Sequence, residues 1–209
     1  MKKQLLLLLV ALVALTITLT SCEGWLDPAW PSFNPDGIEE EENVEEKIYP
    51  SVGLEYKLLT DDVTGEEYYM IVGIGNCDDT HIRIPETYHG IPITHIGVGA
   101  FMNEKSITEV TFTQNIKSIG DLAFAGTSIT KFEIPDSVEM VSGDAIATSP
   151  VKEIVIGKNC VLAPMALARS TALETITVHE ENKNYEVVDG VLYGINLTED
   201  GEVERVLIQ

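Results

Sequence analysis

Three histidines and a cysteine lie close together in the chain, and all four are residue types that bind transition metals. They are His81, His89, His95 and Cys77. Zinc sites place their ligands at short, fixed intervals, and these spacings match no such pattern. Strand alternation points His81 outward, whereas His95 falls in a turn segment. We therefore expect no metal site.

Two cysteines in the later part of the chain, Cys77 and Cys160, are candidates for a disulfide. A disulfide requires Cα atoms within about 7 Å of each other. The repeat register described below separates these residues by several strands. We therefore expect both to be buried free thiols.

Acidic pairs and isolated polar residues suggest other chemistry. Asp61-Asp62, Glu66-Glu67 and Asp78-Asp79 could bind calcium, yet no loop places ligands at alternate positions before a bidentate glutamate. Ser170 and His179 lack the partners that activate a nucleophile. There is no glycine-rich phosphate loop, and the coil predicted below shows no pair of carboxylates across a cleft, as glycoside hydrolysis needs. The sequence therefore predicts neither an enzyme nor a cofactor.

The chain of 209 residues is strongly acidic. It holds 13 Lys and Arg against 34 Asp and Glu, which leaves a formal net charge of −21. Nucleic acid is excluded as a partner, because affinity for phosphates comes mainly from basic side chains. Docking on an anionic membrane through a basic patch is excluded for the same reason. With 44% hydrophobic and 22% charged residues, the chain is predicted to fold.

The N-terminus has the pattern of an export signal. Lys2 and Lys3 precede an apolar run from Leu5 to Leu15, which is too short to span a bilayer as a mature helix. The segment ends in Leu19-Thr20-Ser21-Cys22, which resembles the lipobox of bacterial lipoproteins. The resemblance implies that the signal peptide, residues 1–21, is removed and that Cys22 carries acyl chains such as palmitate. An ordinary signal peptide with a chance cysteine is the alternative.

Residues 22–49 differ in composition from the rest of the chain. They are rich in Asp, Glu and Pro, with Lys47 as the single base. Such a segment has little to bury and repels itself, so it is predicted to be a disordered acidic tether. Its Trp25, Trp30 and Phe33 could rest at the membrane interface.

The remainder of the chain repeats itself with a period of 22 residues. Three columns of apolar residues recur over four copies. The columns are Ile107, Ile129, Val151 and Leu173; Val110, Phe132, Ile154 and Ile176; and Phe112, Ile134, Ile156 and Val178. A period of 22 lies within the range of leucine-rich repeats.

Each copy predicts one short strand and one short turn. In Val110-Thr111-Phe112 the apolar residues alternate with a polar one, which points two side chains into a core and one outward. Gly97 and Gly120 suit a tight turn, and the Ala-Phe pairs that follow them are predicted to lie on a short helical turn. Stacking then joins the copies into one core. The inner ladder of this core is predicted to be Phe101, Phe124, Ile146 and Leu167.

The repeated segments resemble the BspA-type leucine-rich repeat of bacterial surface proteins. The pattern Ile-x-x-Ile-Gly-x-x-Ala-Phe, followed by Ile-x-x-Val-x-Phe and Ile134-Pro135-Asp136-Ser137-Val138, carries the resemblance. It implies a right-handed solenoid with short parallel strands on the concave face, short helical or 3-10 turns and loops on the convex face, and hairpin caps at both ends. It also implies adhesion or protein interaction, in some members with host matrix proteins.

The leucine-rich-repeat domain is predicted to cover residues 50–209. Its parts are the N-terminal cap and half-repeat at 50–92, about four repeats at 93–179 and the C-terminal cap at 180–209. The first cap is predicted to be a hairpin of residues 56–59 against residues 68–72. The second is predicted to turn at Asp189-Gly190 and Asp200-Gly201, both of which are strong hairpin signals.

The concave strand face is the first place to look for a ligand. Its outward side chains are predicted to be His81, Arg83, Glu109, Thr111, Lys131, Glu133, Glu153, Val155, Thr175 and Thr177. They include no cluster of aromatic anchors, and their area of about 250–300 Å² is far below the roughly 800 Å² of a standard interface. A partner would also have to touch flanking loops, or be bound by many copies on one membrane.

Together these features predict a non-enzymatic, lipid-anchored binding module at the outer membrane or cell surface of a Gram-negative bacterium, or on the periplasmic face. The predicted partners are the membrane, through the lipid, and a protein or glycan ligand. The alternatives are an acidic envelope spacer without a specific ligand and a glycan-binding accessory protein. Asp136-Ser137-Val138 also resembles a short glycosylation signal of some Gram-negative bacteria.

Overall fold

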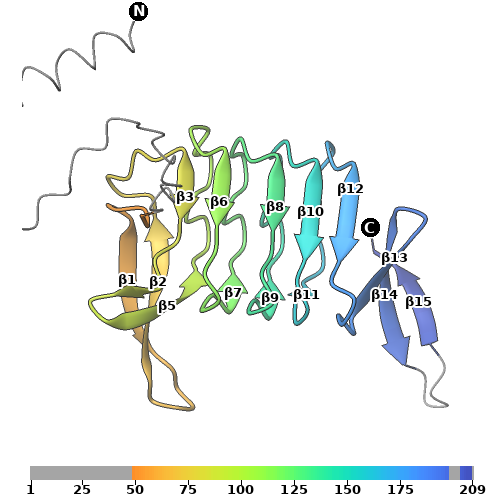
Figure 1. Cartoon of the computed structure of the whole chain (residues 1–209), viewed down its shortest axis with the longest axis horizontal. Helices are drawn as coiled ribbons and strands as arrows, with labels where there is room; N and C mark the ends of the chain where they lie inside the picture. Colours follow the sequence, from red (N-terminus) through yellow and green to blue (C-terminus); the bar gives the residue numbers. More distant parts are fainter. Residues whose placement is uncertain (1–48, 198–202, 209) are drawn as a thin grey trace, which may run out of the picture. The chain divides into compact units, whose positions relative to one another are not determined.

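The computed structural model describes residues 49–197 and 203–208. Residues 47–209 form one compact unit, in which successive coils build a β-solenoid (Figure 1). Short strands lie along one side of it: β3 (His81–Arg83), β6 (Glu109–Thr111), β8 (Lys131–Glu133), β10 (Glu153–Ile156) and β12 (Thr175–Val178). Neighbours that pair do so in parallel. The predicted solenoid with short parallel strands is thus confirmed. We call the outward side of these five strands the main strand face.

A second parallel sheet, which the sequence analysis did not predict, runs along the opposite side of the coils. Its repeat strands are β5 (Ile91–Ile96), β7 (Ser118–Ile119), β9 (Met140–Val141) and β11 (Val161–Leu162). A short strand, β4 (Thr87–Tyr88), pairs with β5. His95 therefore lies in a strand rather than in a turn. The strands were missed because three of them have only two residues, too few to show an alternating pattern.

The segments between the two sheets are turns, and no helix occurs among the described residues, which consequently contain no helix able to cross a bilayer. The predicted short helical turns are therefore wrong. Each coil holds two residues at positive φ, four positions apart. The pairs are Gly99 and Asn103, Leu122 and Gly126, Asp144 and Thr148, and Met165 and Arg169. A right-handed helix cannot pass through such positions.

Backbone hydrogen bonds between coils explain why these turns are not helical. In the turn that carries Phe101, alternate N–H groups donate to carbonyls of the next coil: Gly99 to Asp121 at 2.9 Å, Phe101 to Ala123 at 2.8 Å and Asn103 to Ala125 at 2.8 Å. A helix would use these donors within one segment. In the stacked coils these N–H groups donate to the next coil instead. The turns therefore form a third hydrogen-bonded ladder, beside the ladders of the two sheets.

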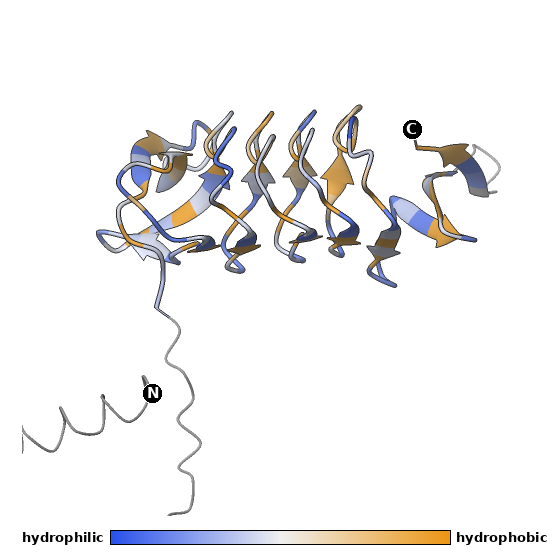
Figure 2. Cartoon of the chain, turned by 90° about the horizontal axis from the view of Figure 1, so that it is seen from above, coloured by the Kyte–Doolittle hydropathy of each residue, from blue (hydrophilic) through white to orange (hydrophobic). Residues whose placement is uncertain are grey.

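The core is a stack of side chains from consecutive coils, and Figure 2 shows the apolar segments recurring along the solenoid. Phe101, Phe124 and Ile146 are at most 1% exposed, and Leu167 packs against them while partly exposed. The rings of Phe101 and Phe124 stack with centroids 5.0 Å apart. The predicted inner ladder is present, and its C-terminal member, Leu167, is less buried than the other three.

Gly97 and Gly120 are required for a different reason from the one predicted. Neither has a positive φ. A Cβ atom at Gly97 would lie 2.9 Å from the carbonyl oxygen of Ile71, and one at Gly120 would lie 2.8 Å from the carbonyl carbon of Gly97. These contacts are with the preceding coil, so glycine allows neighbouring coils to approach closely.

The N-terminal cap is the predicted hairpin. Strand β1 (Glu55–Thr60) pairs antiparallel with β2 (Glu67–Gly73), and β2 then pairs in parallel with β5. The cap therefore covers the open edge of the second sheet. An aromatic cluster packs beside it, in which Tyr56 stacks on Tyr88 with ring centroids 4.2 Å apart.

The C-terminal cap is a three-stranded antiparallel sheet of β13 (Tyr185–Val188), β14 (Val191–Leu197) and β15 (Val203–Leu207). The predicted turn at Asp189-Gly190 joins β13 and β14 with both residues at positive φ, as a tight hairpin requires. The predicted turn at Asp200-Gly201 lies outside the described residues.

Two side chains close the last coil. The Tyr185 hydroxyl accepts a hydrogen bond from the Leu162 N–H at 2.9 Å and donates one to the Leu162 carbonyl at 3.2 Å. The Asn182 amide donates to the carbonyls of Gly157 and Cys160. These polar groups replace a further strand, so the edge of β11 is not left open.

Substituting Phe124→Ala should lower the free energy of unfolding by about 3–5 kcal/mol, because it removes a fully buried ring and leaves a cavity between coils. Chemical denaturation of residues 47–209 measures the loss. Val98→Ala, at a side chain that is 71% exposed, is the control and should change stability by less than about 0.5 kcal/mol. Equal effects of the two substitutions would contradict a shared core at Phe124.

Substituting Tyr185→Phe should cost about 1–3 kcal/mol, because it leaves both backbone groups of Leu162 buried without a partner. Hydrogen exchange of the Leu162 amide, followed by NMR, should accelerate while amides of β8 remain protected. An unchanged Leu162 amide would show that the hydroxyl does not cap this edge.

Candidate binding face

Two rows of side chains point outward from the main strand face. The first row is His81, Glu109, Lys131, Glu153 and Thr175, and the second is Arg83, Thr111, Glu133, Val155 and Thr177. The residue between the two rows on each strand points into the core, from Ile82 on β3 to Ile176 on β12. The structure thus brings all ten predicted ligand-facing residues onto one surface.

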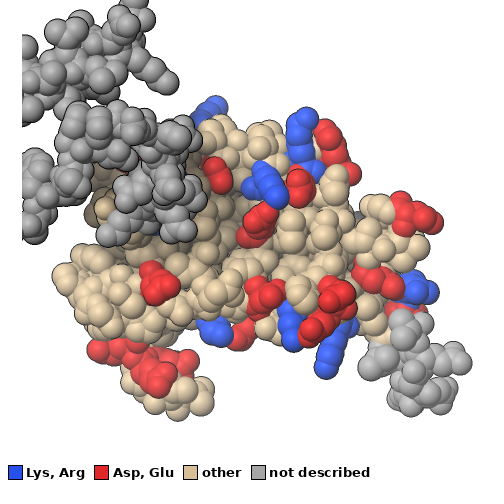
Figure 3. Space-filling model, viewed as in Figure 1, with Lys and Arg blue, Asp and Glu red and all other residues tan. Residues whose placement is uncertain are grey.

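Most charges on this face are paired with one another. Lys131 contacts Glu133 at 2.6 Å and Glu153 at 3.4 Å, and His81 contacts Glu109 at 3.3 Å. Hydrogen bonds to the two glutamates raise the pKa of Lys131. Figure 3 shows basic and acidic side chains interspersed over the coils, with acidic ones gathered at the tip of the β1–β2 hairpin. The face therefore presents no large area of one sign.

Arg83 differs from the other bases on this face. Its side chain is half-buried, and its Nε atom is buried without a hydrogen-bond partner. Among the described residues it forms no ion pair with an acidic side chain. Arg83 is thus the one base on this face whose charge is not paired with an acidic side chain of the described residues.

The hydrogen-bonded ladder of the main strand face is interrupted between β6 and β8. The paired strands form a sheet of β3 with β6 and a separate sheet of β8, β10 and β12. At the junctions that pair, the Ile84 N–H donates to Thr111 and the Ile134 N–H donates to Val155. The equivalent bond, from the Phe112 N–H to Glu133, is absent.

A second bond is missing at the same junction. The Thr108 N–H donates to Thr80 and the Lys152 N–H to Thr130, both at 2.8 Å, whereas the Thr130 N–H makes no such bond to Thr108. Figure 1 shows β6 and β8 farther apart than the other neighbouring strands on this side. The continuous five-stranded face expected from the repeat register is therefore split into two parts.

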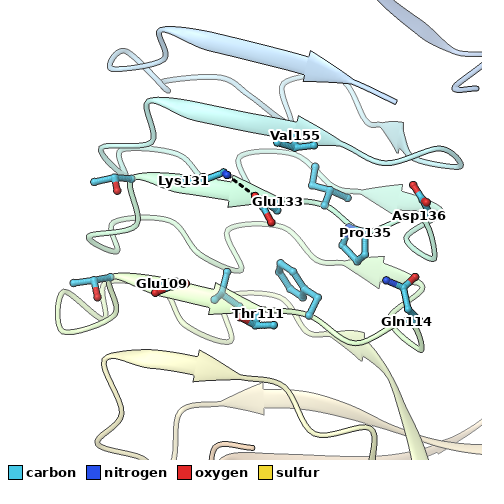
Figure 4. Close-up of a pocket in the computed structure, with 13 residues that line it drawn as sticks. Glu109, Thr111, Gln114, Lys131, Glu133, Pro135, Asp136 and Val155 are labelled. Atoms are coloured by element: carbon cyan, nitrogen blue, oxygen red, sulfur yellow. Dashed lines mark ion pairs between the residues drawn. The ribbon is translucent and has the colours of Figure 1, made fainter. Parts of the chain in front are cut away.

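An open groove of about 640 Å³ lies at this junction. Thr108, Glu109 and Thr111 line it from β6 and the residue before it, and Lys131 and Glu133 line it from β8 (Figure 4). Further lining comes from Phe112, Gln114, Pro135, Asp136 and Val155. Half of the predicted ligand-facing residues, five of ten, thus belong to the groove, a feature that the repeat pattern did not reveal.

A cluster of phenylalanines explains the gap. The ring of Phe112 lies 5.7 Å from that of Phe124 and 5.6 Å from that of Phe132, and these last two are 5.3 Å apart. The later coils hold Ile154 and Ile176 in place of Phe132. Three rings occupy more volume than aliphatic side chains, and they hold the coils apart at this level.

The gap also exposes part of the core. Phe112 occupies the same column as Ile134 and Ile156, which are 2% and 0% exposed, yet its own ring is only half-buried. No covering strand contact protects it, so an aromatic surface lines the groove. The sequence signal for this feature is the replacement of Ile by Phe at positions 112 and 132.

The groove carries carboxylates on both walls, contrary to the expectation that the coil offers none. The side chains of Glu109 and Glu133 are 62% and 61% exposed, and each contacts a basic side chain. Both carboxylates are therefore largely exposed to solvent rather than enclosed in a cleft.

The other residues singled out for chemistry are not brought together. Within the described part of the chain, no group of three or more His, Cys, Asp or Glu residues could hold a metal ion. Cys77 and Cys160 are both buried and free, as predicted. Burial raises the pKa of the Cys160 thiol to about 12 and also lowers the pKa of His95. Cys22 lies outside the described residues.

The short motif Asp136-Ser137-Val138 has a structural role. The Asp136 carboxylate accepts a hydrogen bond from the Lys158 N–H at 2.7 Å, and Val138 is fully buried. The Ser137 hydroxyl oxygen is also buried. The residue is only partly exposed and its acceptor oxygen is covered, which argues against the modification that the motif left open.

Comparison with known proteins identifies the repeats. Residues 75–198 match the BspA type leucine rich repeat region in six copies. The chain belongs to this family. No curated protein matches the chain.

Three solved structures are similar to the chain. One is a leucine-rich-repeat protein of T. pallidum, 17% identical, with a TM-score of 0.47 over 62% of this chain and 71% of the other. A leucine-rich-repeat protein of Eubacterium ventriosum is 23% identical, with a TM-score of 0.46 over 66% of this chain and 46% of the other. A leucine-rich cell surface protein of Faecalibacterium prausnitzii is 17% identical, with a TM-score of 0.33 over 77% of this chain and 60% of the other.

The interrupted ladder predicts a difference in hydrogen exchange. The amides of Phe112 and Thr130 should exchange on the order of tenfold or more faster than those of Ile134 and Lys152, which occupy the same positions one coil later and are hydrogen-bonded. NMR of residues 47–209 after transfer into D₂O measures all four exchange rates in one sample. Equal protection would mean that the ladder is continuous in solution.

Proposed function

We propose that this protein is a lipid-anchored, non-enzymatic adhesion module of a bacterial cell surface that recognises a protein partner through its main strand face. Membership of the BspA-type leucine-rich-repeat family supports a repeat module that binds proteins at a surface. The proposed anchor is Cys22, on the lipobox-like sequence at the end of the apolar N-terminal run. The proposed location is the outer membrane or surface of a Gram-negative cell.

The observation that carries this proposal is the double row of ten outward side chains on two neighbouring parallel sheets. Backbone groups held in strands lose little conformational entropy when a partner binds, so the side chains start from fixed positions along the face. Arg83, the unpaired base of this face, is the proposed contact for an acidic or carbonyl group of the partner.

The small area of the face requires many copies. At the usual strand spacing of about 4.8 Å and lengths of roughly 10–13 Å, five strands cover about 250–300 Å², against about 800 Å² per partner in a standard interface. The gap between β6 and β8 divides this area into two parts. Single contacts of this size are weak. Many copies anchored in one membrane would bind together with much higher avidity.

The test is an array of immobilised matrix proteins probed with residues 47–209 displayed in many copies on beads. Saturable binding to at least one protein is expected, and Arg83→Glu or Lys131→Glu should weaken it about tenfold or more, because each reverses a charge on the face. Circular dichroism checks that both variants remain folded.

Lys117→Glu is the matched control. Lys117 is 49% exposed and paired with Glu139, as Lys131 is 51% exposed and paired with Glu153, but it precedes β7 on the opposite side of the coils. The control should bind as the unmodified protein does. Absence of binding across the array would favour an acidic spacer, and equal loss in Lys117→Glu would place the contact elsewhere.

A further inference from the structure

We propose that the groove between β6 and β8, which lies within the main strand face, binds a short neutral oligosaccharide. The inference does not depend on recognition of a protein partner. It rests on four observations at this junction: unpaired backbone groups, a half-buried aromatic ring, the sign of the surrounding charge and the size of the space.

The interrupted ladder leaves both hydrogen-bond donors and hydrogen-bond acceptors of the backbone unpaired. By the register of the neighbouring coils, the Thr108 carbonyl and the Phe112 N–H face the groove from β6, and the Thr130 N–H and the Glu133 carbonyl face it from β8. A hydroxyl group both donates and accepts hydrogen bonds. A polyhydroxylated ligand can therefore satisfy both walls with one type of group.

Side chains around the rim extend the same chemistry. Thr111 and Gln114 add a hydroxyl and an amide, and Glu109, Glu133 and Asp136 add carboxylate acceptors. Such groups, in a small number and fixed by strands, orient a small polar ligand.

The ring of Phe112 supplies the apolar contact. It lines the groove and is half-buried, unlike its fully covered equivalents Ile134 and Ile156. The face of an aromatic ring carries a negative potential. The C–H groups on one side of a sugar ring are weakly positive and pack well against such a face, while the sugar hydroxyls reach the walls.

The charge of the groove selects among sugars. Glu109, Glu133 and Asp136 line it, and Lys131 is the single base among its lining residues and is already paired with Glu133 and Glu153. Sulfated, sialylated or uronate-containing glycans would be repelled by this net negative charge. The ligand that fits is therefore uncharged.

The size of the groove favours an oligosaccharide over a peptide strand. A space of about 640 Å³ lies in the range of small-ligand sites. A peptide that paired with both β6 and β8 would need them about 9.6 Å apart, which is twice the strand spacing. Cα atoms of β6 and β8 lie within 8 Å of each other, so the strands have not opened that far.

The test is an NMR titration of residues 47–209 with neutral tetrasaccharides of glucose, mannose, galactose and N-acetylglucosamine. At least one should produce saturable shifts of the Phe112 and Thr130 amides and leave those of β12 unchanged. Thr111→Arg, which fills the groove, should abolish the shifts. Phe112→Ile, which keeps a core side chain used by the neighbouring coils, should weaken binding about tenfold.

Met140→Arg is the control, because Met140 is 40% exposed on β9, in the second sheet on the opposite side of the coils, and belongs to neither proposed site. It should bind as the unmodified protein does. A sulfated tetrasaccharide should bind more weakly than its neutral form at low salt. The proposal is overturned by absence of saturable shifts with every neutral sugar, by equal loss in Met140→Arg, by tighter binding of the sulfated form, or by shifts with an extended peptide alone. The protein array tests a different ligand, so its outcome is independent of these results.

Discussion

Stacking of one coil on the next is the interaction on which this structure depends. No coil buries its apolar side chains alone, and in the turns alternate backbone N–H groups donate to the carbonyls of a neighbouring coil rather than to their own segment. Three ladders result: two from the sheets and one from the turns. The left-handed residues that recur twice in each coil are a consequence, because they turn alternate peptide groups towards the next coil. Gly97 and Gly120 allow the required close approach.

A stack of this kind has two weak points, its ends and any level at which the coils fit badly. The ends are closed by different means: a hairpin continues the second sheet at the N-terminus, and the side chains of Tyr185 and Asn182 occupy the last edge at the C-terminus. The poor fit occurs between β6 and β8, where the rings of Phe112, Phe124 and Phe132 meet. The ring packing that fills the core there also interrupts the hydrogen-bonded ladder of the main strand face. It leaves polar backbone groups unpaired and the ring of Phe112 partly exposed. The candidate site is thus formed where three bulky rings keep neighbouring coils from pairing.

Charge sets what this surface can bind. Lysines and glutamates one repeat apart neutralise each other across the coils, as in Lys117 with Glu139 and Lys152 with Glu174. Exposed pairs of this kind add little stability, and they leave few unpaired bases in a chain with a net charge of −21. Strong electrostatic attraction is therefore not available to the main strand face. Shape, hydrogen bonds and the number of anchored copies remain as the sources of affinity.

The sequence by itself determined the period of the repeats, the inward and outward rows of the main strands and the hairpin at the N-terminal cap. These features follow from the spacing of apolar side chains, which depends only on residues close together in the sequence. On any strand with this alternation, Phe132 points inward and Lys131 outward. The tertiary structure alone decided the second sheet, the conformation of the turns, the burial of the Ser137 hydroxyl and the gap at β6–β8. The second sheet, the turns and the gap depend on hydrogen bonds and ring contacts between residues about one repeat apart in the sequence. Such residues become neighbours only when the coils are stacked.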